Sequence, residues 1–281
     1  MFILSGFLDE YSSDFTEQLE GAKRLEMHNI ELRFVDGVNV ANLSEEKVNE
    51  IKVILKKENV RVSAIGSPIG KISLDDDFDE HLDTAEKIFK TAKELDCKLI
   101  RIFSFYLNGR TREESFELVV KRLQKLLNLA DKFSLTLCLE NEEGLYGESP
   151  ESCLELCEYF KGKLRTVFDM GNFLLCGYEP YKVAYDLLKE YIEYFHIKDA
   201  LKDGAIVPCG EGDAEIEKIL KDYKSNYPNK NVYVSSEPHL VDFVGLSDLA
   251  THNLKKKISF EDEKQAFVYA CGNLVEMINR I

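Results

Sequence analysis

The sequence lacks any apolar run long enough to cross a bilayer, which takes about 20 residues in a helix. The N-terminal segment 1–7, MFILSGF, is apolar but short, has no basic region before it and leads directly into acidic residues. Such a segment is typical of a first strand and not of a secretion signal. We therefore expect a cytoplasmic protein with no membrane partner.

Positive charge is also scarce. Lys and Arg number 36 against 51 Asp and Glu, which gives a formal net charge of −15, and no basic block interrupts the acidic excess. A protein that grips a phosphate backbone needs Lys and Arg clustered on the surface that faces it. We therefore do not expect nucleic acid as a substrate or partner.

Two short motifs are missing. The seven cysteines form no CxxC pair, and a chain of 281 residues without a secretion signal does not have the character of a small disulfide-stapled scaffold. Cys153 and Cys157 share a predicted helix face, and we interpret these two as small buried hydrophobes. No GxGxxG follows the first apolar segment, which argues against a dinucleotide-binding sheet.

The sequence does contain a repeated alternation of short apolar runs and longer amphipathic stretches, with no low-complexity linker between them. Strands are predicted at 2–7, 30–35, 61–67, 99–105, 135–141, 165–170, 192–199 and 231–237. Helices are predicted at 44–58, 81–95, 112–133 and 258–281, among others. Eight such units fit a closed barrel better than an open sheet of five or six strands. The predicted fold is α/β, a single (β/α)8 TIM barrel spanning residues 1–281.

Four of the predicted strands end near a side chain that can bind a metal. Glu140, Asp169, His196 and Glu237 lie toward the ends of the fifth to eighth strands. Side chains alternate across a strand, and the apolar neighbours of these four suit the outer helices, which turns the four inward. The C-terminal mouth, where they would meet, is where barrels of this kind carry out chemistry.

A metal ion would explain this gathering of acids. Three unpaired carboxylates in one confined space repel one another and raise one another's pKa values, and a divalent cation removes that conflict. Three carboxylates with one imidazole favour Mn²⁺ or Mg²⁺, with Co²⁺ and Zn²⁺ as alternatives. A single acid at a strand end is usually a helix cap or a solvated charge. The four residues together predict one divalent metal site.

The sequence resembles the xylose isomerase-like TIM barrel superfamily over nearly the whole chain. The similarity rests on the order and spacing of LENEEG at 139–144, FDMGN at 168–172, FHIKD at 195–199, VPCGEGD at 207–213 and VSSE at 234–237, with GSPIGK at 66–71. Within the superfamily it looks most like the sugar 3-epimerases and related sugar-phosphate isomerases. The resemblance implies a metal-dependent isomerase or epimerase acting on a small carbohydrate.

By the same resemblance, Glu140 and Glu237 bind the metal and also form the catalytic acid/base pair. The reaction would be proton abstraction beside a carbonyl, through an ene-diolate that a Lewis-acidic ion stabilises. Two bases on opposite faces of a substrate invert a stereocentre, whereas one base on one face moves the proton between carbons. The sequence leaves 3-epimerisation and aldose–ketose isomerisation both open. Glu211 and Asp213 in the loop after the seventh strand slightly favour an unphosphorylated sugar.

Five further residues are candidate substrate contacts. The resemblance places Asn172 where some epimerases have a substrate-binding histidine, and Lys202 near a substrate-binding arginine. Lys198 faces inward and is expected either to bind substrate or to neutralise a neighbouring acid. Arg33 and Arg101 lie on the inferred inward rows of the second and fourth strands.

Several polar residues also have structural interpretations. An ion pair between Arg33 and Glu31 inside the barrel is at least as good an interpretation as substrate binding. The GEGD segment is expected to form a turn that ends with Asp213 as a helix N-cap. The other histidines are expected to lie in a loop or beside helices, without a catalytic role: His28, His81, His239 and His252.

Three other functions compete with this interpretation. Endonuclease IV shares the superfamily, but its three-zinc cluster needs many histidines, and the acidic charge here opposes DNA. A metal-dependent dehydratase or lyase acting on an inositol-derived or hydroxy-keto acid would begin with the same proton abstraction, and Lys198 would then protonate the departing hydroxyl. A non-catalytic sugar-binding barrel has no evident need for two opposed glutamates. The resemblance also makes a dimer or tetramer a reasonable expectation.

Overall fold

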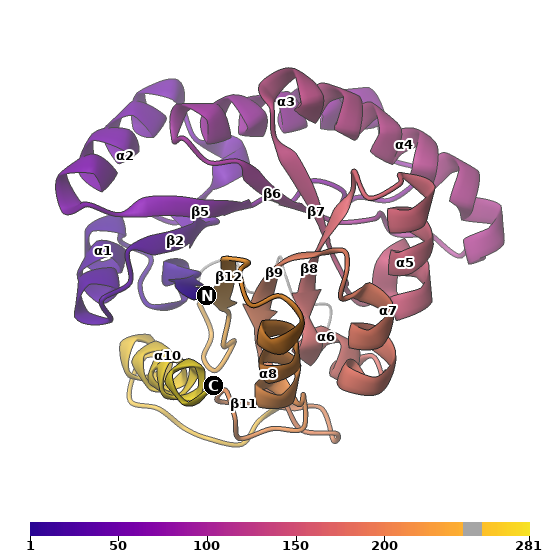
Figure 1. Ribbon diagram of the computed structural model, residues 1–281. Coiled ribbons are helices and arrows are strands. Elements are labelled where there is room, and N and C mark those ends of the chain that lie inside the picture. Colours follow the sequence, from indigo (N-terminus) through magenta and orange to yellow (C-terminus); the bar gives the residue numbers. More distant parts are fainter. Residues whose placement is uncertain (244–254) are drawn as a thin grey trace.

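Eight parallel strands form a nearly closed barrel with helices around it in the computed structural model, which describes residues 1–243 and 255–281 (Figure 1). The hydrogen-bonded order is β1-β12-β9-β8-β7-β6-β5-β2, and β1 also lies against β2 where the ring closes. The predicted (β/α)8 barrel is thereby confirmed. The strand bounds are β1 (Phe2–Gly6), β2 (Asn29–Leu32), β5 (Arg61–Gly66), β6 (Leu99–Ile102), β7 (Thr136–Glu140), β8 (Arg165–Asp169), β9 (Ile192–Ile197) and β12 (Val232–Ser236).

The outward rows of the strands pack on the helices as predicted. Phe195 of β9 contacts Tyr223 of helix α8 (Ile216–Asn226) with ring centroids 5.0 Å apart, and Phe168 of β8 contacts Phe173 of helix α6 (Met170–Leu175) at 5.3 Å. Because side chains alternate across a strand, these outward contacts turn the intervening residues into the barrel. Burial of the apolar rows therefore aims the polar residues between them at the barrel interior.

The helices begin at side-chain caps that the sequence supplies. Thr111 and Glu114 form a capping box at the start of α4, whose bounds match the prediction. The last helix begins at Glu263 and not at 258, because the Asp262 side chain accepts a hydrogen bond from the backbone of Gln265 and caps it there. The bounds are α1 (Phe15–Arg24), α2 (Glu45–Glu58), α3 (Phe78–Glu94), α4 (Arg112–Phe133), α5 (Pro150–Tyr159), α6 (Met170–Leu175), α7 (Asp186–Leu188), α8 (Ile216–Asn226) and α10 (Glu263–Arg280).

Short elements decorate the loops of the barrel. Two small sheets form, one by pairing β3 with β4 and one with the order β10-β11-β13. Their strands are β3 (Phe34–Val35), β4 (Val38–Asn39), β10 (Asp199–Ala200), β11 (Ala205–Val207) and β13 (Lys255–Lys256). Single-turn helices are η1 (Leu8–Glu10), η2 (Val40–Asn42) and η3 (Tyr146–Glu148), and a π-helix η4 covers Pro180–Tyr185.

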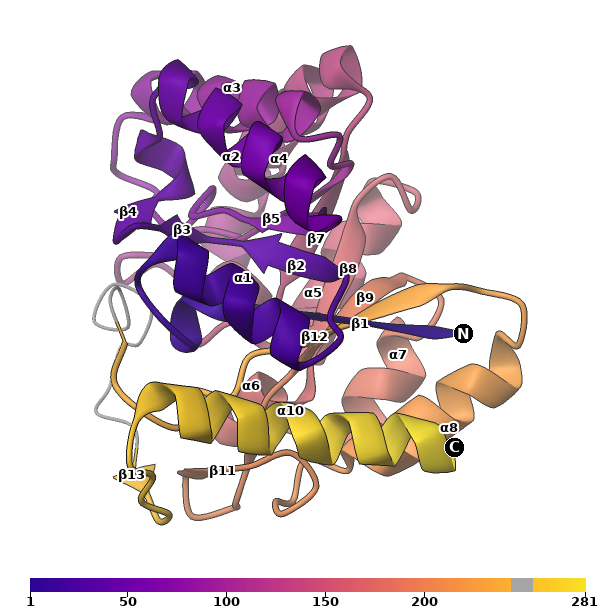
Figure 2. The same ribbon diagram turned by 90° about the vertical axis from the view of Figure 1, so that its left-hand side faces the viewer.

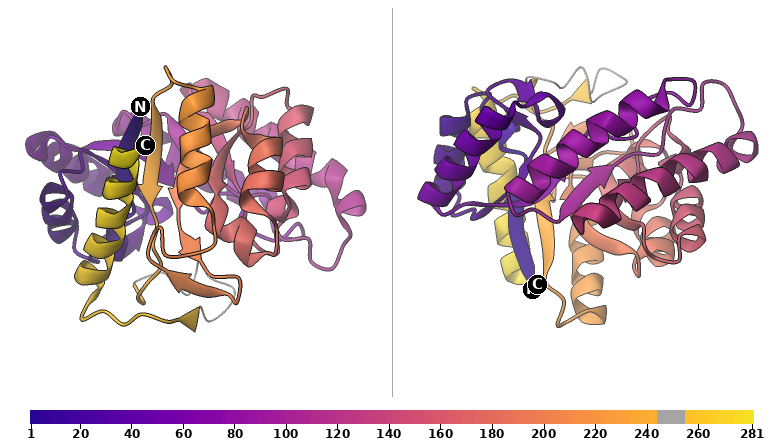
Figure 3. Two further views of the ribbon diagram at one scale, coloured as in Figure 1. Left: turned by 60° about the horizontal axis from the view of Figure 1, so that its bottom comes forward. Right: turned by 90° about the horizontal axis from the view of Figure 1, so that it is seen from above.

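Helix α10 lies along the outside of the barrel, beside β1 and α1 (Figure 2). The two chain ends come together at the end of the barrel opposite the C-terminal mouth (Figure 3). Among the described residues, no helix has both the length and the apolar character needed to cross a membrane.

All seven cysteines are free thiols. Six are buried, and burial raises the pKa of Cys97 to about 12. The thiol of Cys153 donates to the carbonyl of Gly147 at 3.1 Å. The interpretation of Cys153 and Cys157 as small buried hydrophobic residues is therefore confirmed, while Cys176 is partly exposed.

Candidate metal centre and active site

The four predicted metal ligands converge at the C-terminal mouth. His196 lies opposite Asp169 in the β8–β9 register. Its Nδ1 atom is 2.7 Å from Glu140 Oε1 and 3.3 Å from Glu237 Oε2. One ligand atom from each of the four residues falls within 4.8 Å of the others, and all four side chains are buried. The strands thus place three carboxylates and one imidazole around one point.

Two buried oxygens in this cluster lack hydrogen-bond partners among the described residues, namely Asp169 Oδ2 and Glu237 Oε2. A buried carboxylate oxygen without a partner is costly, and a cation is the kind of ligand that satisfies it. Three hard oxygen donors and one imidazole also make a chemically suitable set for a divalent ion. The residues present therefore fit a metal ion and could hold one.

Three basic side chains surround the cluster, one for each acid. Arg101 Nη1 donates to Glu140 Oε2 at 2.8 Å. Arg33 Nη1 donates to Glu237 Oε1 at 2.8 Å. Lys198 Nζ lies 2.9 Å from Asp169 Oδ2, at ion-pair distance but without hydrogen-bond geometry. Each glutamate thus gives one oxygen to an arginine and directs the other toward His196.

The electrostatics of the cluster favour ionised glutamates. Burial opposes ionisation of Glu140, but His196 and Arg101 bring its pKa down to about 2. Burial opposes ionisation of Glu237 too, yet Lys198 and His196 lower its pKa well below the ordinary value. Burial disfavours charge on His196, but the surrounding carboxylates raise its pKa well above the ordinary value. Both glutamates are therefore held in the ionised form at neutral pH.

The loop after β8 is clamped to the loop after β7. The Asp169 carboxylate caps helix α6, because its Oδ1 accepts the backbone N–H of Asn172 at 2.8 Å. The side chain of Asn141 donates to the carbonyl of Asp169 and accepts its N–H. Asn172 Nδ2 in turn donates to the carbonyl of Asn141. These bonds leave Oδ2 as the Asp169 oxygen that faces the cluster.

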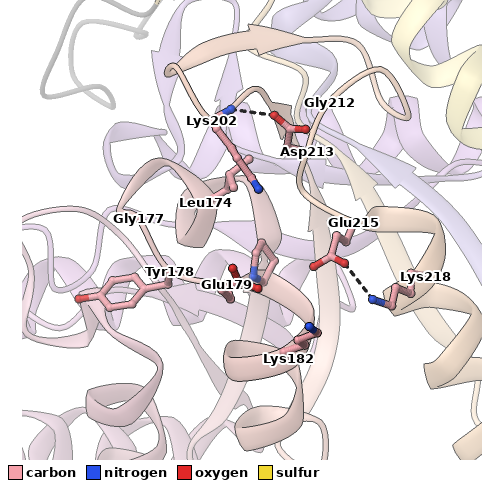
Figure 4. A pocket seen from close by; sticks show the side chains of 11 residues that line it. Leu174, Gly177, Tyr178, Glu179, Lys182, Lys202, Gly212, Asp213, Glu215 and Lys218 are labelled. Carbon is pink, nitrogen blue, oxygen red and sulfur yellow. Dashed lines mark hydrogen bonds and ion pairs between the residues drawn. The ribbon is translucent and has the colours of Figure 1, made fainter.

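The five predicted substrate contacts are divided between two places. Arg33, Arg101 and Lys198 lie against the cluster, and Asn172 lies beside it in the clamp. Lys202 instead is exposed and lines a pocket of about 660 Å³ between η4 and the start of α8, a pocket whose lining includes none of the four predicted ligands (Figure 4).

The expected Arg33–Glu31 ion pair is wrong. Arg33 Nε and Nη2 donate to Asp9 and Glu10, at 2.8 Å and 3.1 Å, in addition to the bond to Glu237. Glu31 instead reaches His196, with Oε2 3.0 Å from Nε2. Two charged residues on one strand can pair with each other or with residues on other strands and loops of the barrel. Here Arg33 and Glu31 both bind partners from other parts of the barrel.

Sequence reasoning missed the acids that follow the first strand. Asp9 and Glu10 lie in η1, the short helix that follows β1, where the strand-alternation argument that identified Glu140 gives no side-chain direction. Both are buried beside Arg33. His239 is a loop residue as expected, but it is buried, with Nε2 3.3 Å from Glu10 Oε1 and 3.4 Å from Glu237 Oε1. His252 lies outside the described residues.

The prediction of Asp213 as a helix N-cap is also wrong. Helix α8 begins after Glu215, which has a left-handed backbone and no side-chain cap, and Asp213 accepts the N–H of Lys202. The glycine loop wraps the Asp199 carboxylate, which accepts backbone N–H bonds from Gly210 and Gly212 as well as from Ala200 and Ala214. A Cβ on Gly212 would lie 2.1 Å from Asp199 Oδ1. The loop therefore needs glycine there to approach the carboxylate.

Comparisons with solved structures show the same fold at low sequence identity. The protein described as a probable 3-DHS dehydratase, AsbF, from Bacillus anthracis has a TM-score of 0.75 at 18% identity, covering 99% of this chain and 100% of that one. The IOLI protein with a bound zinc atom has a TM-score of 0.76 at 16%, covering 99% and 98%. D-Psicose 3-epimerase from Clostridium cellulolyticum H10, solved with D-tagatose, has a TM-score of 0.72 at 14%, also covering 99% and 98%.

No curated protein sequence matches this chain significantly. The family model for the xylose isomerase-like TIM barrel matches residues 19–234, which include three of the four predicted metal ligands and most of the barrel strands. The chain therefore belongs to the xylose isomerase-like TIM barrel family.

Proposed function

We propose that this protein is a divalent-metal-dependent sugar isomerase or epimerase, with Glu140 and Glu237 as its acid/base pair. The observation that carries the proposal is the approach of both glutamates to His196 Nδ1, Glu140 Oε1 at 2.7 Å and Glu237 Oε2 at 3.3 Å. The proposed metal ligands are Glu140, Asp169, His196 and Glu237, with Mn²⁺ or Mg²⁺ favoured by the excess of oxygen donors.

The chain's own residues account for the proton transfer. A divalent ion bound at this site supplies Lewis acidity toward a substrate carbonyl, which acidifies the neighbouring carbon-bound hydrogen. One glutamate removes that proton and the other returns one, each as a positioned acid or base. Arg101 and Arg33 hold one oxygen of each glutamate and so fix the orientation of both carboxylates.

The five predicted substrate contacts differ in how close they lie to the cluster and in which of their atoms already have partners. Lys198 lies in the cluster and is proposed to hold a substrate oxygen as well as to balance Asp169. Arg33 and Arg101 already donate to carboxylates, so we propose for them a positioning role beside any direct contact with substrate. Asn172 Nδ2 already donates to the carbonyl of Asn141, so we propose that its Oδ1 atom accepts from a substrate hydroxyl. Lys202 would contact only a substrate that extends into the pocket of Figure 4.

The test is proton NMR of ketoses, aldoses and their phosphates incubated in D₂O with the purified protein and Mn²⁺. Deuterium at C3 with a new diastereomer is the result expected of an epimerase. Exchange at C1 or C2 with formation of the aldose is the result expected of an isomerase. Glu237→Gln should abolish deuterium exchange while keeping the fold. The control is Glu193→Gln on β9, which should leave the exchange activity intact, because Glu193 pairs with Arg165 away from the cluster.

Absence of exchange in every sugar, with metal bound, would overturn the proposal, as would full activity in Glu237→Gln. The first of these outcomes would bring forward a dehydratase or a non-catalytic sugar-binding barrel. For the non-catalytic barrel, equilibrium binding of the sugar should persist in Glu140→Gln.

A second candidate is a dehydratase acting on a hydroxy-keto or inositol-derived substrate. The observation in its favour is the buried ammonium of Lys198, 3.7 Å from Glu237 Oε2, where it could protonate a departing hydroxyl. The dehydratase-like structural relative AsbF supports only the fold. The same NMR measurement separates the two candidates once hydroxy-keto acids and inositol-derived compounds are added to the panel, because dehydration produces an unsaturated or keto product with one water less, whereas isomerisation conserves mass.

A further inference from the structure

Glu31 makes an unusual contact behind the proposed metal centre. Its carboxylate crosses the barrel from β2, and Oε2 lies 3.0 Å from His196 Nε2. The other oxygen, Oε1, accepts a hydrogen bond from the hydroxyl of Tyr194 at 2.8 Å. All three side chains are at most 2% exposed, so water does not compete for these bonds.

The backbone at this point of β2 is irregular. The register between β2 and β5 shifts between Ile30 and Glu31, and the Ser63 hydroxyl donates to the carbonyl of Ile30 at the same place. Irregularities of this kind re-aim side chains and are frequent next to active sites. The shift therefore occurs at the residue whose side chain reaches His196.

The two nitrogens of the His196 ring face different partners. Nδ1 faces Glu140 and Glu237, the proposed ligands, whereas Nε2 faces Glu31. A neutral imidazole carries its proton on one nitrogen and offers a lone pair on the other, and the hydrogen bond at one nitrogen decides which. The charged ring carries a proton on both nitrogens, and a carboxylate at Nε2 keeps the proton there when a metal takes the place of the one on Nδ1.

We propose that Glu31, itself held by Tyr194, is a positioning residue that fixes the tautomer and the orientation of His196 for metal binding through Nδ1. The inference rests on the proposed metal centre and adds to it a residue outside the four ligands. Loss of such an outer partner typically weakens metal binding roughly 10- to 100-fold. Tyr194 acts one step further out, so its loss should cost less than tenfold.

The experiment measures Mn²⁺ and Zn²⁺ affinity by calorimetry for wild type, Glu31→Gln, Tyr194→Phe and Glu193→Gln. Glu193→Gln is the matched control, since it makes the same chemical change next to Tyr194 but on the side that faces Arg165. We expect roughly 10- to 100-fold weaker binding in Glu31→Gln. We expect a smaller loss in Tyr194→Phe and no change beyond about twofold in the control.

The second readout is the tautomer of His196. Long-range ¹H–¹⁵N correlation of the Zn²⁺-loaded wild type, with His196→Gln to assign the signal, should show a proton on Nε2 and none on Nδ1. This measurement needs no variant of Glu31 and stays informative if Glu31→Gln fails to fold. A proton on Nδ1, or wild-type affinity in a folded Glu31→Gln, would overturn the inference. Neither measurement uses a substrate, so absence of turnover with the expected tautomer would count against the proposed function alone.

Discussion

His81 is expected to make the protein sensitive to mild acid. It lies on α3, is 9% exposed, and its Nε2 accepts the backbone N–H of Gly70 at 2.8 Å. Burial, assisted by the nearby charge of Arg122, lowers the pKa of His81 to about 4 from an ordinary value of 6.5. The folded protein therefore holds a neutral imidazole whose acceptor nitrogen secures the loop between β5 and α3.

The sign and size of the effect follow from linkage. As the pH falls below 6.5, the unfolded chain takes up a proton at His81 before the folded chain does, so stability is lost between pH 6.5 and about 4. Each pKa unit corresponds to about 1.4 kcal/mol, so the free energy of unfolding should drop by about 2 kcal/mol at pH 5 and by about 3 kcal/mol once both states are protonated.

The assay is urea denaturation of wild type and His81→Gln between pH 7.5 and pH 4.5. Acid titration of all other groups is common to both proteins, so the difference in unfolding free energy isolates His81. Between pH 7.5 and pH 5 the wild type should lose about 2 kcal/mol more free energy of unfolding than the variant. The control is His28→Gln, which removes an exposed histidine and should leave the difference flat. A flat difference for His81→Gln would refute the reasoning.

Three further changes have defined outcomes. Asp199→Asn would turn an amide N–H₂ toward backbone N–H groups that donate to the carboxylate in the wild type, so urea denaturation should show a loss of about 2 kcal/mol or more in the free energy of unfolding. The control Glu211→Gln, in the same loop, should unfold near wild type. Gly70→Ala should cost over about 3 kcal/mol or displace the loop, because a Cβ would lie 2.1 Å from the carbonyl oxygen of Phe103 at a φ of +84°; thermal unfolding measures it. In a sample whose free metal concentration is about 100 times the Kd, removal of the metal by EDTA should lower the Tm by roughly 5–10 °C. An unchanged Tm would argue against a metal that stabilises the folded state. In Asp169→Ala the Tm should not respond to EDTA, since that variant lacks a proposed ligand.

The barrel and its four-residue cluster were predictable because both depend on local patterns. An apolar row along a strand predicts an outward face, and the next residue along, such as Glu140 or His196, must then face inward. Chain order places consecutive parallel strands side by side, which brings their C-terminal ends to one mouth. Alternation gives no direction for Glu10, because that residue lies in the short helix η1 beyond the end of β1.

Contacts across the barrel were not predictable in this way. Arg33 and Glu31 lie two residues apart on an inward row, and the sequence suggested that they pair with each other. The barrel instead offers Arg33 the acids after β1 and offers Glu31 the far nitrogen of His196. Which of several inward charges meet depends on barrel shear and on the irregular register of β2, and neither is encoded in residue spacing.

The sequence by itself determined the fold class, the strand-end positions and the set of metal-capable side chains, because alternation and amphipathic spacing are properties of a local segment. Only the tertiary structure decided which cation balances which acid and which nitrogen of His196 faces the cluster. It also decided that Asp199, and not Asp213, organises the glycine loop. Those outcomes depend on distances between segments far apart in the chain, where buried charges select the partners that satisfy them most completely.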